Sequence, residues 1–211
     1  MLGGVVTGSL LDHHEAPDPL GLGVSMVNQP CSNQSLVVTI AGSSAARLAS
    51  AVAEDPHHVR YLHIADSCPT VWTSGGTRSH GYATYLGPYP TVGAACQVRM
   101  TAEHRGDLVT RLSDGSREPV QCLCYLAYQT MPQLRPGMTV DALDGIYVFA
   151  LQDVLASIGL NPTDHLTGTY DQATIDAVKA FQHARALPAN GVVDAATWHD
   201  LQGPGCQNRT D

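Results

Sequence analysis

Six cysteines constrain this chain more than any other feature. They are spread over 211 residues, with no CxxC pair, at Cys31, Cys68, Cys96, Cys122, Cys124 and Cys206. Intracellular thiols are usually kept reduced, so this many cysteines without metal-binding spacing predict disulfide bonds in an oxidising, extracytoplasmic space. We therefore expect small cross-linked domains in a protein that is secreted or anchored at a membrane.

Two of these cysteines, Cys122 and Cys124, are separated by a single residue. A bridge between such close neighbours would be strained, so each is expected to have a distant partner. Cys206 follows the last predicted helix and is expected to return to Cys122 or Cys124, which would clamp the C-terminal region at its two ends. The linker cysteine that remains would then bond to Cys31.

The net charge of −8 argues against a nucleic-acid partner, because such surfaces need clustered Lys and Arg and no basic run occurs. Every basic side chain except Lys179 is arginine, and Ala and Gly are abundant, which indicates a GC-rich, actinobacterial source. The apolar start, residues 1–11, is shorter than the roughly 20 residues that span a bilayer. It is either the remnant of a membrane anchor missing from the N-terminus or a frayed end.

Two regions can be recognised in the first part of the chain. Residues 12–30 lack periodicity and are rich in turn formers, so residues 1–30 are expected to be a flexible arm or the remnant of a membrane or signal segment. Residues 31–117 alternate between β-branched runs and amphipathic stretches, which predicts an α+β domain. Its strands are expected at residues 35–40, 59–64, 81–86 and 108–112.

Two helices are expected in this domain, after the first and the third strand. They would be capped by a serine of Ser43–Ser44 and by Thr91. The resulting order, βαββαβ, is the ferredoxin-like pattern. Cys68, just after the second strand, and Cys96, on the second helix, can meet within the domain, although the sequence alone does not choose among the fifteen possible pairings.

The second part of the chain reads as a linker and a helical domain. Residues 118–140 mix Pro, Gly and polar residues around two cysteines, which predicts a Cys-containing linker. In residues 141–206 apolar side chains recur at i, i+3, i+4 and i+7, which predicts three helices. Asp194 is expected to cap the last of them.

The helical part resembles the three-helix peptidoglycan-binding domain attached to many bacterial wall proteins. The resemblance is carried by Val148, Leu151-Gln152, Leu155, Gly159, Gly168-Thr169-Tyr170, Thr174, Ala177-Val178, Phe181-Gln182, Leu187-Pro188, Asn190-Gly191-Val192-Val193-Asp194, Thr197-Trp198 and Leu201. Most of these positions are expected to form the core or turns. For wall polymer, which offers amides and sugar faces, we expect ligand contacts from Tyr170, Asp171, an exposed Gln182 and Asn190. The loop at residues 161–166 is longer and more polar than the family's usual turn.

The α+β part resembles the SPOR domain over residues 33–113. The resemblance rests on the βαββαβ order, on the first strand around Val38-Thr39-Ile40 and on Tyr82-Ala83-Thr84-Tyr85-Leu86-Gly87-Pro88-Tyr89. It implies binding of glycan strands on the open face of the sheet, with Thr39, Tyr85 and Tyr89 as candidate contacts. Strand alternation would turn Val38, Ile40, Thr84 and Leu86 towards the helices and leave Thr39, Ala83 and Tyr85 on that open face.

Motifs for catalysis are absent from the sequence. No HExxH, HxH, Gly-x-Ser-x-Gly or P-loop pattern occurs, and Ser79-His80-Gly81 matches a zinc-peptidase motif only faintly, so we expect no metal and no cofactor. Cys68 after His63 is the nearest candidate for a nucleophile, but a disulfide is expected there.

The function predicted from the sequence is non-catalytic binding of peptidoglycan outside the cytoplasm, for anchoring, targeting or wall sensing. Two weak sites on one chain would gain avidity on a repeating polymer. Two alternatives stay open at this point. One is a peptidoglycan hydrolase, an amidase or carboxypeptidase with its site in the N-terminal domain, and the other is a protein-interaction module tethered to the wall.

Overall fold

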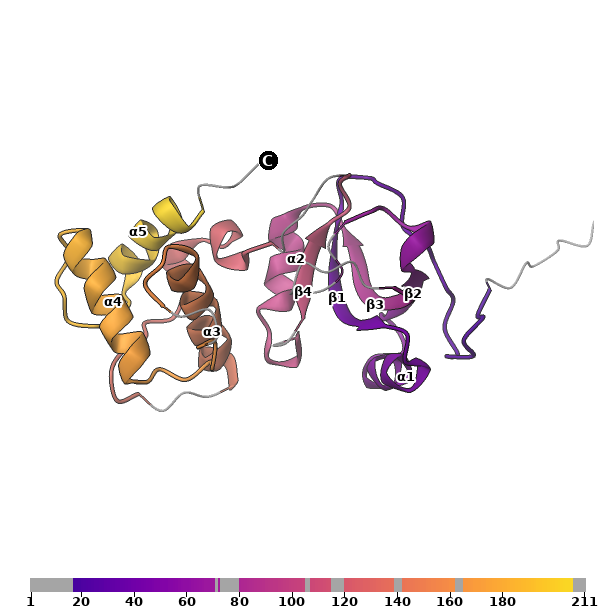
Figure 1. The fold of residues 1–211 in the computed structure, drawn as a ribbon, viewed down its shortest axis with the longest axis horizontal. Helices are drawn as coiled ribbons and strands as arrows, with labels where there is room; N and C mark the ends of the chain where they lie inside the picture. Colours follow the sequence, from indigo (N-terminus) through magenta and orange to yellow (C-terminus); the bar gives the residue numbers. More distant parts are fainter. Residues whose placement is uncertain are drawn as a thin grey trace, which may run out of the picture.

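An α+β domain and a helical domain lie next to each other in the computed structural model of this chain (Figure 1). The expectations for the apolar start, residues 1–11, lie outside the described residues. None of the helices that the structure describes is long and apolar enough to cross a membrane. The described residues are 17–70, 72, 80–104, 107–114, 120–138, 142–161 and 165–206.

The first domain is built on a four-stranded antiparallel sheet with the strand order β2-β3-β1-β4. Helix α1 follows β1 and helix α2 follows β3, so the elements occur in the predicted order. The bounds are β1 (Ser35–Gly42), α1 (Ala45–Glu54), β2 (Arg60–His63), η1 (Ile64–Asp66), β3 (Tyr82–Tyr89), α2 (Val92–Arg99), η2 (Ala102–His104) and β4 (Leu108–Arg111).

Both helices of this domain begin at a capping side chain. The Ser44 hydroxyl accepts a hydrogen bond from the Arg47 N–H at 3.4 Å, and the Thr91 hydroxyl accepts one from the Ala94 N–H at 3.2 Å. Each cap satisfies an N–H group that the first helical turn leaves without an intrahelical partner. The capping predicted for these two helices is thus confirmed.

The sheet is covered on both faces. On the face towards α1 and α2, Val37 and Leu86 belong to one apolar cluster. On the other face, Val38 and Tyr85 pack with Trp72 in a second cluster. The sheet therefore has two cores and lacks the open face that the sequence predicted.

The sequence analysis assigned the side chains of β1 to the wrong faces of the sheet. Val38 faces away from the helices, whereas Thr39 lies on the helix side, where its hydroxyl is 2.7 Å from the hydroxyl of Thr84. The cause is the aliphatic run 36–38, in which every residue is buried, so it carries no alternation from which a phase can be read. In β3 Leu86 faces the helices as expected, although residues 83–86 are also all buried.

Residues 17–30 pack against the sheet domain, in contrast with the flexible arm expected at this end of the chain. The Val27 N–H donates to the Tyr61 carbonyl at 2.8 Å, beside the edge strand β2. The Gln29 side chain donates to the Tyr85 hydroxyl at 2.7 Å, and that hydroxyl donates to the Val27 carbonyl at 2.9 Å. The composition suggested disorder, but these contacts give the polar groups of the arm partners within the domain.

Three disulfides join all six cysteines: Cys31–Cys68, Cys96–Cys122 and Cys124–Cys206. The return of Cys206 to a linker cysteine is confirmed, while the predicted pairs Cys68–Cys96 and Cys31 with a linker cysteine are wrong. The packed arm brings Cys31 to the segment after β2, and the linker turn packs against α2. Neither placement is encoded in cysteine spacing alone.

The C-terminal domain contains three α-helices, as predicted. Leu151, Val178, Phe181 and Trp198 are at most 2% exposed and form its core. Asp194 caps the last helix through the Thr197 N–H at 2.9 Å, which confirms that prediction. The bounds are η3 (Cys122–Tyr125), η4 (Tyr128–Thr130), α3 (Ala142–Ser157), α4 (Gln172–Ala184) and α5 (Ala195–Gly205).

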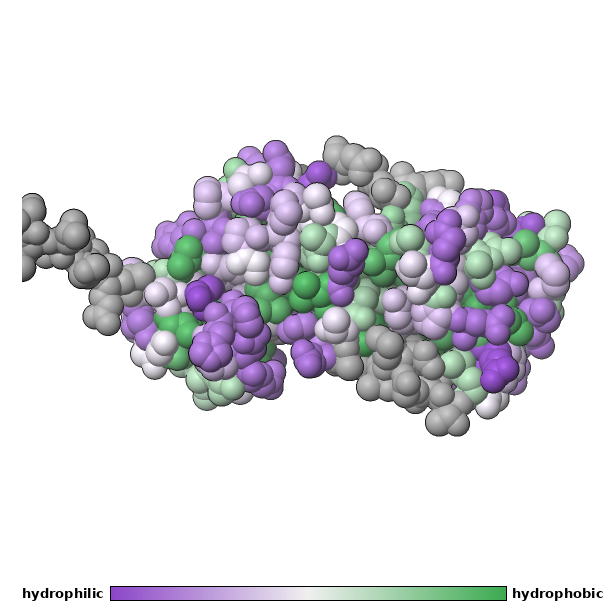
Figure 2. Space-filling model, turned by 180° about the vertical axis from the view of Figure 1, so that it is seen from behind, coloured by the Kyte–Doolittle hydropathy of each residue, from purple (hydrophilic) through white to green (hydrophobic). Residues whose placement is uncertain are grey.

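The turn η3 joins the two domains covalently. Cys122 bonds it to α2 of the sheet domain, and Cys124 bonds it to the end of α5. Ile146 of α3 is fully buried in the helix-side cluster of the sheet domain, and Gln202 of α5 donates to the Leu123 carbonyl at 2.6 Å. Figure 2 shows apolar surface near the middle of one face, over the region where the domains meet.

Candidate functional site

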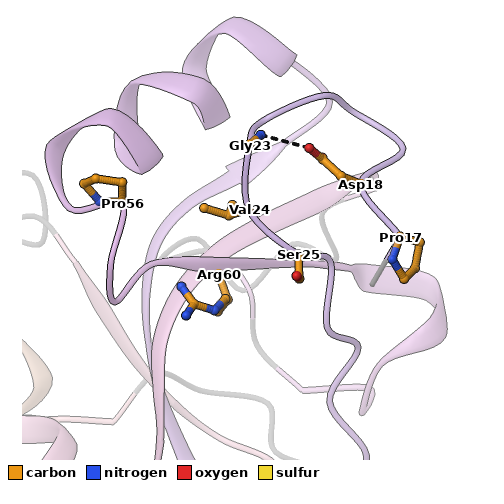
Figure 3. A pocket seen from close by; sticks show the side chains of 7 residues that line it. All are labelled: Pro17, Asp18, Gly23, Val24, Ser25, Pro56 and Arg60. Carbon is orange, nitrogen blue, oxygen red and sulfur yellow. Dashed lines mark hydrogen bonds between the residues drawn. The ribbon is translucent and has the colours of Figure 1, made fainter. Parts of the chain in front are cut away.

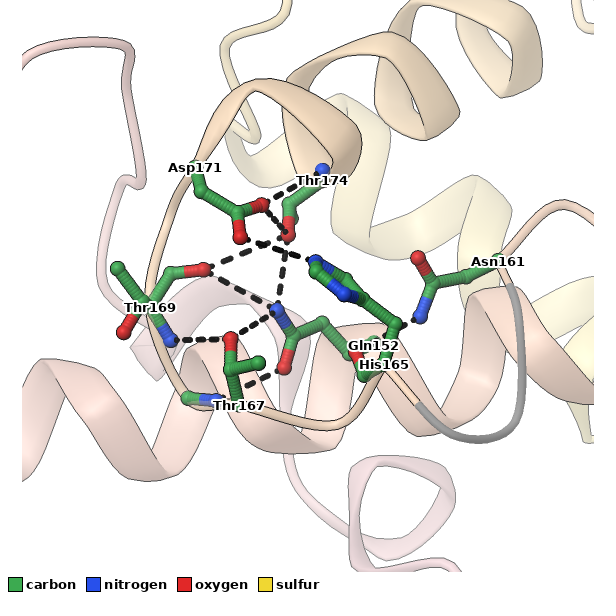
Figure 4. Close-up of polar contacts among 8 residues, drawn as sticks. Gln152, Asn161, His165, Thr167, Thr169, Asp171 and Thr174 are labelled. Atoms are coloured by element: carbon green, nitrogen blue, oxygen red, sulfur yellow. Dashed lines mark hydrogen bonds and ion pairs between the residues drawn. The ribbon is translucent and has the colours of Figure 1, made fainter.

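The first candidate feature is a turn before α4 that is organised around a buried glutamine (Figure 4). Gln152 accepts a hydrogen bond from the Gly168 N–H at 2.9 Å and donates to the Thr169 carbonyl at 3.1 Å. Its amide also donates to the Thr174 hydroxyl at 2.8 Å. One fully buried side chain thus satisfies both backbone groups of the turn and orients the helix that follows.

The same arrangement is repeated before α5. Gln182 accepts from the Gly191 N–H at 2.9 Å and donates to the Val192 carbonyl at 2.7 Å. Its amide lies 3.3 Å from the Thr197 hydroxyl. Gln182 is only 1% exposed, so the prediction that it is exposed is wrong.

An aspartate completes each copy of the motif. Asp171 accepts from the N–H and the hydroxyl of Thr174 at 3.0 and 2.9 Å. Asp194 accepts from the same two groups of Thr197, both at 2.9 Å. The domain therefore contains an internal repeat, a Gln followed by Gly-x-x-Asp-x-x-Thr, which the sequence shows as Gly168-Thr169-Tyr170-Asp171-Gln172-Ala173-Thr174 and Gly191-Val192-Val193-Asp194-Ala195-Ala196-Thr197. Comparing these two segments would have revealed it, and our sequence analysis missed it.

Tyr170 connects the two turns. Its hydroxyl donates to the Gly191 carbonyl at 2.7 Å, and the residue is only 7% exposed. Burial raises the pKa of this phenol above its usual range, so it remains a neutral donor. Tyr170 therefore holds the turns together and does not offer a flat ring to a sugar.

Asp171 is also occupied by the protein itself. One carboxylate oxygen caps α4, and the other lies 2.9 Å from His165 Nε2. Burial raises its pKa, but the hydrogen bonds from Thr174 and His165 outweigh burial and keep the pKa below its usual range. His165 belongs to the loop at residues 161–166, which differs from the family's usual turn. Its role was not foreseen because the pair joins a loop residue to the N-cap of the next helix.

The exposed surface beside the joined turns carries hydrogen-bond donors. Asn190 is exposed, and its side-chain oxygen accepts from the Val192 N–H at 2.8 Å, which leaves its amide nitrogen towards solvent. The exposed Lys179 lies over Gly191, where a Cβ would come within 3.3 Å of the lysine Cε. We call three exposed residues, of the two turns and of the helix between them, the turn surface: Thr169, Lys179 and Asn190.

The candidate contacts on the sheet do not share a surface. Tyr85 is 1% exposed beneath the arm, and burial raises its pKa. Thr39 is on the helix side, as described above, and Tyr89 is half-buried against the helix-side cluster. Stacking of a sugar on Tyr85 would require the arm, residues 17–30, to leave the sheet.

The groups that could support catalysis are metal ligands and a free thiol. No group of three or more His, Cys, Asp or Glu side chains in that part of the chain could hold a metal ion. Cys68, the candidate nucleophile, is bonded to Cys31 and therefore lacks a thiol.

Comparison with known families gives a match in the helical domain. Residues 145–201 match the family described as "Putative peptidoglycan binding domain". This segment of the chain contains both copies of the glutamine motif. No curated protein and no solved structure matches the chain significantly. The match supports a C-terminal peptidoglycan-binding domain, and it fits an extracytoplasmic location together with the three disulfides.

Proposed function

We propose that this chain is a non-catalytic, extracytoplasmic protein that binds peptidoglycan through its C-terminal domain. The observation that carries the proposal is the family match over residues 145–201, in a domain whose turns are held by two copies of one buried motif. The disulfides support a location outside the cytoplasm. Anchoring, targeting or wall sensing would each use this binding.

The proposed contact region is the turn surface, Thr169, Lys179 and Asn190. Peptidoglycan offers amide carbonyls and stem-peptide carboxylates, which require hydrogen-bond donors and a positive charge. The hydroxyl, ammonium and amide groups of these residues supply both, on helix α4 and on the turns that the buried glutamines fix. Of the four residues named from the sequence for this domain, Asn190 is the one that stays a direct contact in this proposal.

The N-terminal domain is proposed to have the ferredoxin-like, SPOR-like fold, with the arm as part of it. The strand order and the βαββαβ succession support this assignment. The covered sheet face argues against glycan binding there in the present arrangement. We therefore propose that wall binding resides first in the helical domain.

A sacculus pull-down of the oxidised full chain tests the proposed function. We expect retention on intact peptidoglycan without release of soluble fragments. The double variant Lys179→Gln/Asn190→Ala should be retained several-fold less, whereas the control Arg47→Gln/Gln133→Ala, which changes exposed residues elsewhere, should behave as wild type. Circular dichroism would confirm that both variants fold.

Three other outcomes would each lead to a different conclusion. Absence of wild-type retention would refute peptidoglycan binding. Equal retention of both variants would leave the function but refute the turn surface as its site. Release of fragments that is blocked by a chelator would favour the hydrolase alternative.

A further inference from the structure

A hollow of about 670 Å³ lies between the arm and the start of β2 (Figure 3). The arm contributes Pro17, Asp18 and Val24, and the opposite side is formed by Pro56 and Arg60. The hollow is far from the turn surface, on the other domain, and no feature of the proposed function uses it. Pro17, Val24 and Pro56 give it apolar patches, but the larger part of its exposed lining is polar.

The guanidinium of Arg60 is held in position by the backbone. Its Nη1 donates to the Val59 carbonyl at 2.8 Å and to the His57 carbonyl at 3.1 Å. No partner of its Nε or Nη2 is found among the described residues. Arg60 therefore offers unused donors from a head group whose orientation is already fixed, which lowers the entropic cost of binding an anion.

Asp18, the acidic residue of the hollow, forms hydrogen bonds with groups other than Arg60. Asp18 accepts from the Tyr61 hydroxyl at 2.6 Å and from the N–H groups of Leu22 and Gly23 at 3.0 and 2.8 Å. These three donors hold its pKa below the usual range, the Tyr61 hydroxyl most strongly, and they close the loop of the arm. Asp18 thus builds the wall of the hollow through other donors and leaves Nε and Nη2 of Arg60 available for a ligand.

A second nearby carboxylate, Asp55, is also engaged. It lies 2.9 Å from the His58 ring and caps the turn that leads into β2. The hollow therefore combines an oriented guanidinium that has unused donors with the apolar surfaces of two prolines and a valine. A carboxylate attached to a small apolar group matches both features, because guanidinium binds carboxylates through paired hydrogen bonds.

We propose that this hollow binds the C-terminal carboxylate of a short peptide with small apolar side chains, with Arg60 as its anchor. Stem peptides of the bacterial wall end in such groups, and this choice of source rests on the proposed function. The C-terminus of another protein offers the same chemistry. The carboxylate pairs with Arg60, and the terminal methyl groups lie against Pro17, Val24 and Pro56.

The test is isothermal titration of the full oxidised chain with soluble peptides, which separates this site from retention on sacculi. The probe is N-acetyl-D-Ala-D-Ala, with its C-terminal amide and N-acetyl-L-Ala-L-Ala as comparisons. We expect saturable binding of the acid that Arg60→Gln weakens about tenfold or more, since a charge-assisted pair is lost. Arg60→Lys should keep part of the affinity. The control Arg47→Gln makes an equal charge change at an exposed position of α1 and should keep all of the affinity.

The proposal is overturned if the acid shows no saturable binding, if the amide binds as well as the acid, or if Arg60→Gln binds as wild type. Preference for the D-peptide would support the wall as the source. Equal affinity for both enantiomers would support the carboxylate site and refute the wall as its source. Binding that is lost in Arg60→Gln but kept in Arg60→Lys excludes misfolding as the cause.

Discussion

The buried glutamine of the second turn is the most exacting test of how the helical domain is built. Substitution Gln182→Leu keeps a side chain of similar size but removes the acceptor of the Gly191 N–H and the donor to the Val192 carbonyl. Both groups then lose their partner in a buried site, at about 1–3 kcal/mol each. We expect the free energy of unfolding of this domain to fall by about 2–5 kcal/mol, a large part of a typical domain's stability.

Urea unfolding followed by the fluorescence of Trp198 measures this loss, because that residue is buried in the same core. The second tryptophan would be removed by Trp72→Phe in every protein compared. Gln172→Leu is the matched control, since it deletes only an exposed contact to Asp176 at 2.8 Å, within one helix. Such contacts contribute about 0.2–0.5 kcal/mol.

The internal repeat sharpens the prediction. Gln152→Leu removes the equivalent contacts to Gly168 and Thr169, so its effect should be similar in size. The reasoning is refuted if Gln182→Leu differs from the Gln172→Leu control by less than about 0.5 kcal/mol, the usual range of surface changes. It is also refuted if Gln152→Leu has no effect.

Three further predictions concern the covalent clamp and two titrating groups. Cys124→Ser/Cys206→Ser opens a loop of 82 residues and should lower stability by about 4–5 kcal/mol in the chain-entropy model, measured by urea unfolding under oxidising conditions. Burial and the hydrogen bond to Asp18 raise the pKa of Tyr61 to about 12. The stability that the neutral phenol contributes is therefore fully present below pH 10 and is lost as the pH rises towards 12. Tyrosinate absorbance should show the late titration, and Asp18→Asn should make it earlier. The pKa of Asp171 is lowered in the folded state, so its carboxylate stabilises the domain above the ordinary aspartate pKa. This stability is lost as the pH falls through the folded-state pKa. In thermal melts, Asp171→Asn should therefore flatten the acid side of the stability curve.

The helical domain was predictable because its signals are local. Apolar spacing placed Leu151, Val178 and Trp198 in the core, and the capping role of Asp194 follows from its place before a helical pattern. The function of Gln182 was misjudged, since a polar residue at a helix end is usually exposed. Its burial depends on the turn at Gly191 and Val192, which folds back over it. In the sequence, only the repeated motif indicates that turn.

The sheet domain was predictable in element order but not in its surfaces. The strands and caps follow from β-branched runs and from residues such as Ser44, which act within a few positions. The arm, residues 17–30, reads as disordered from composition, yet it supplies partners to Tyr61 and Tyr85 on distant strands. Contacts of this kind depend on the tertiary arrangement, and the Cys31–Cys68 pairing depends on them in turn.

The neighbouring linker cysteines explain how two small domains can act as one binding unit. Because Cys122 holds α2 and Cys124 holds the end of α5, the short turn between them cannot swing freely against either domain. The buried contact of Ile146 with the sheet domain adds an apolar interface to the two covalent ones. A flexible linker raises the effective concentration of the second site at every separation that it can span, whereas a fixed joint favours ligands with one spacing. The two proposed sites, the turn surface and the Arg60 hollow, therefore belong to one cross-linked unit, and the two proposals together predict that avidity depends on the spacing of stem peptides along the polymer.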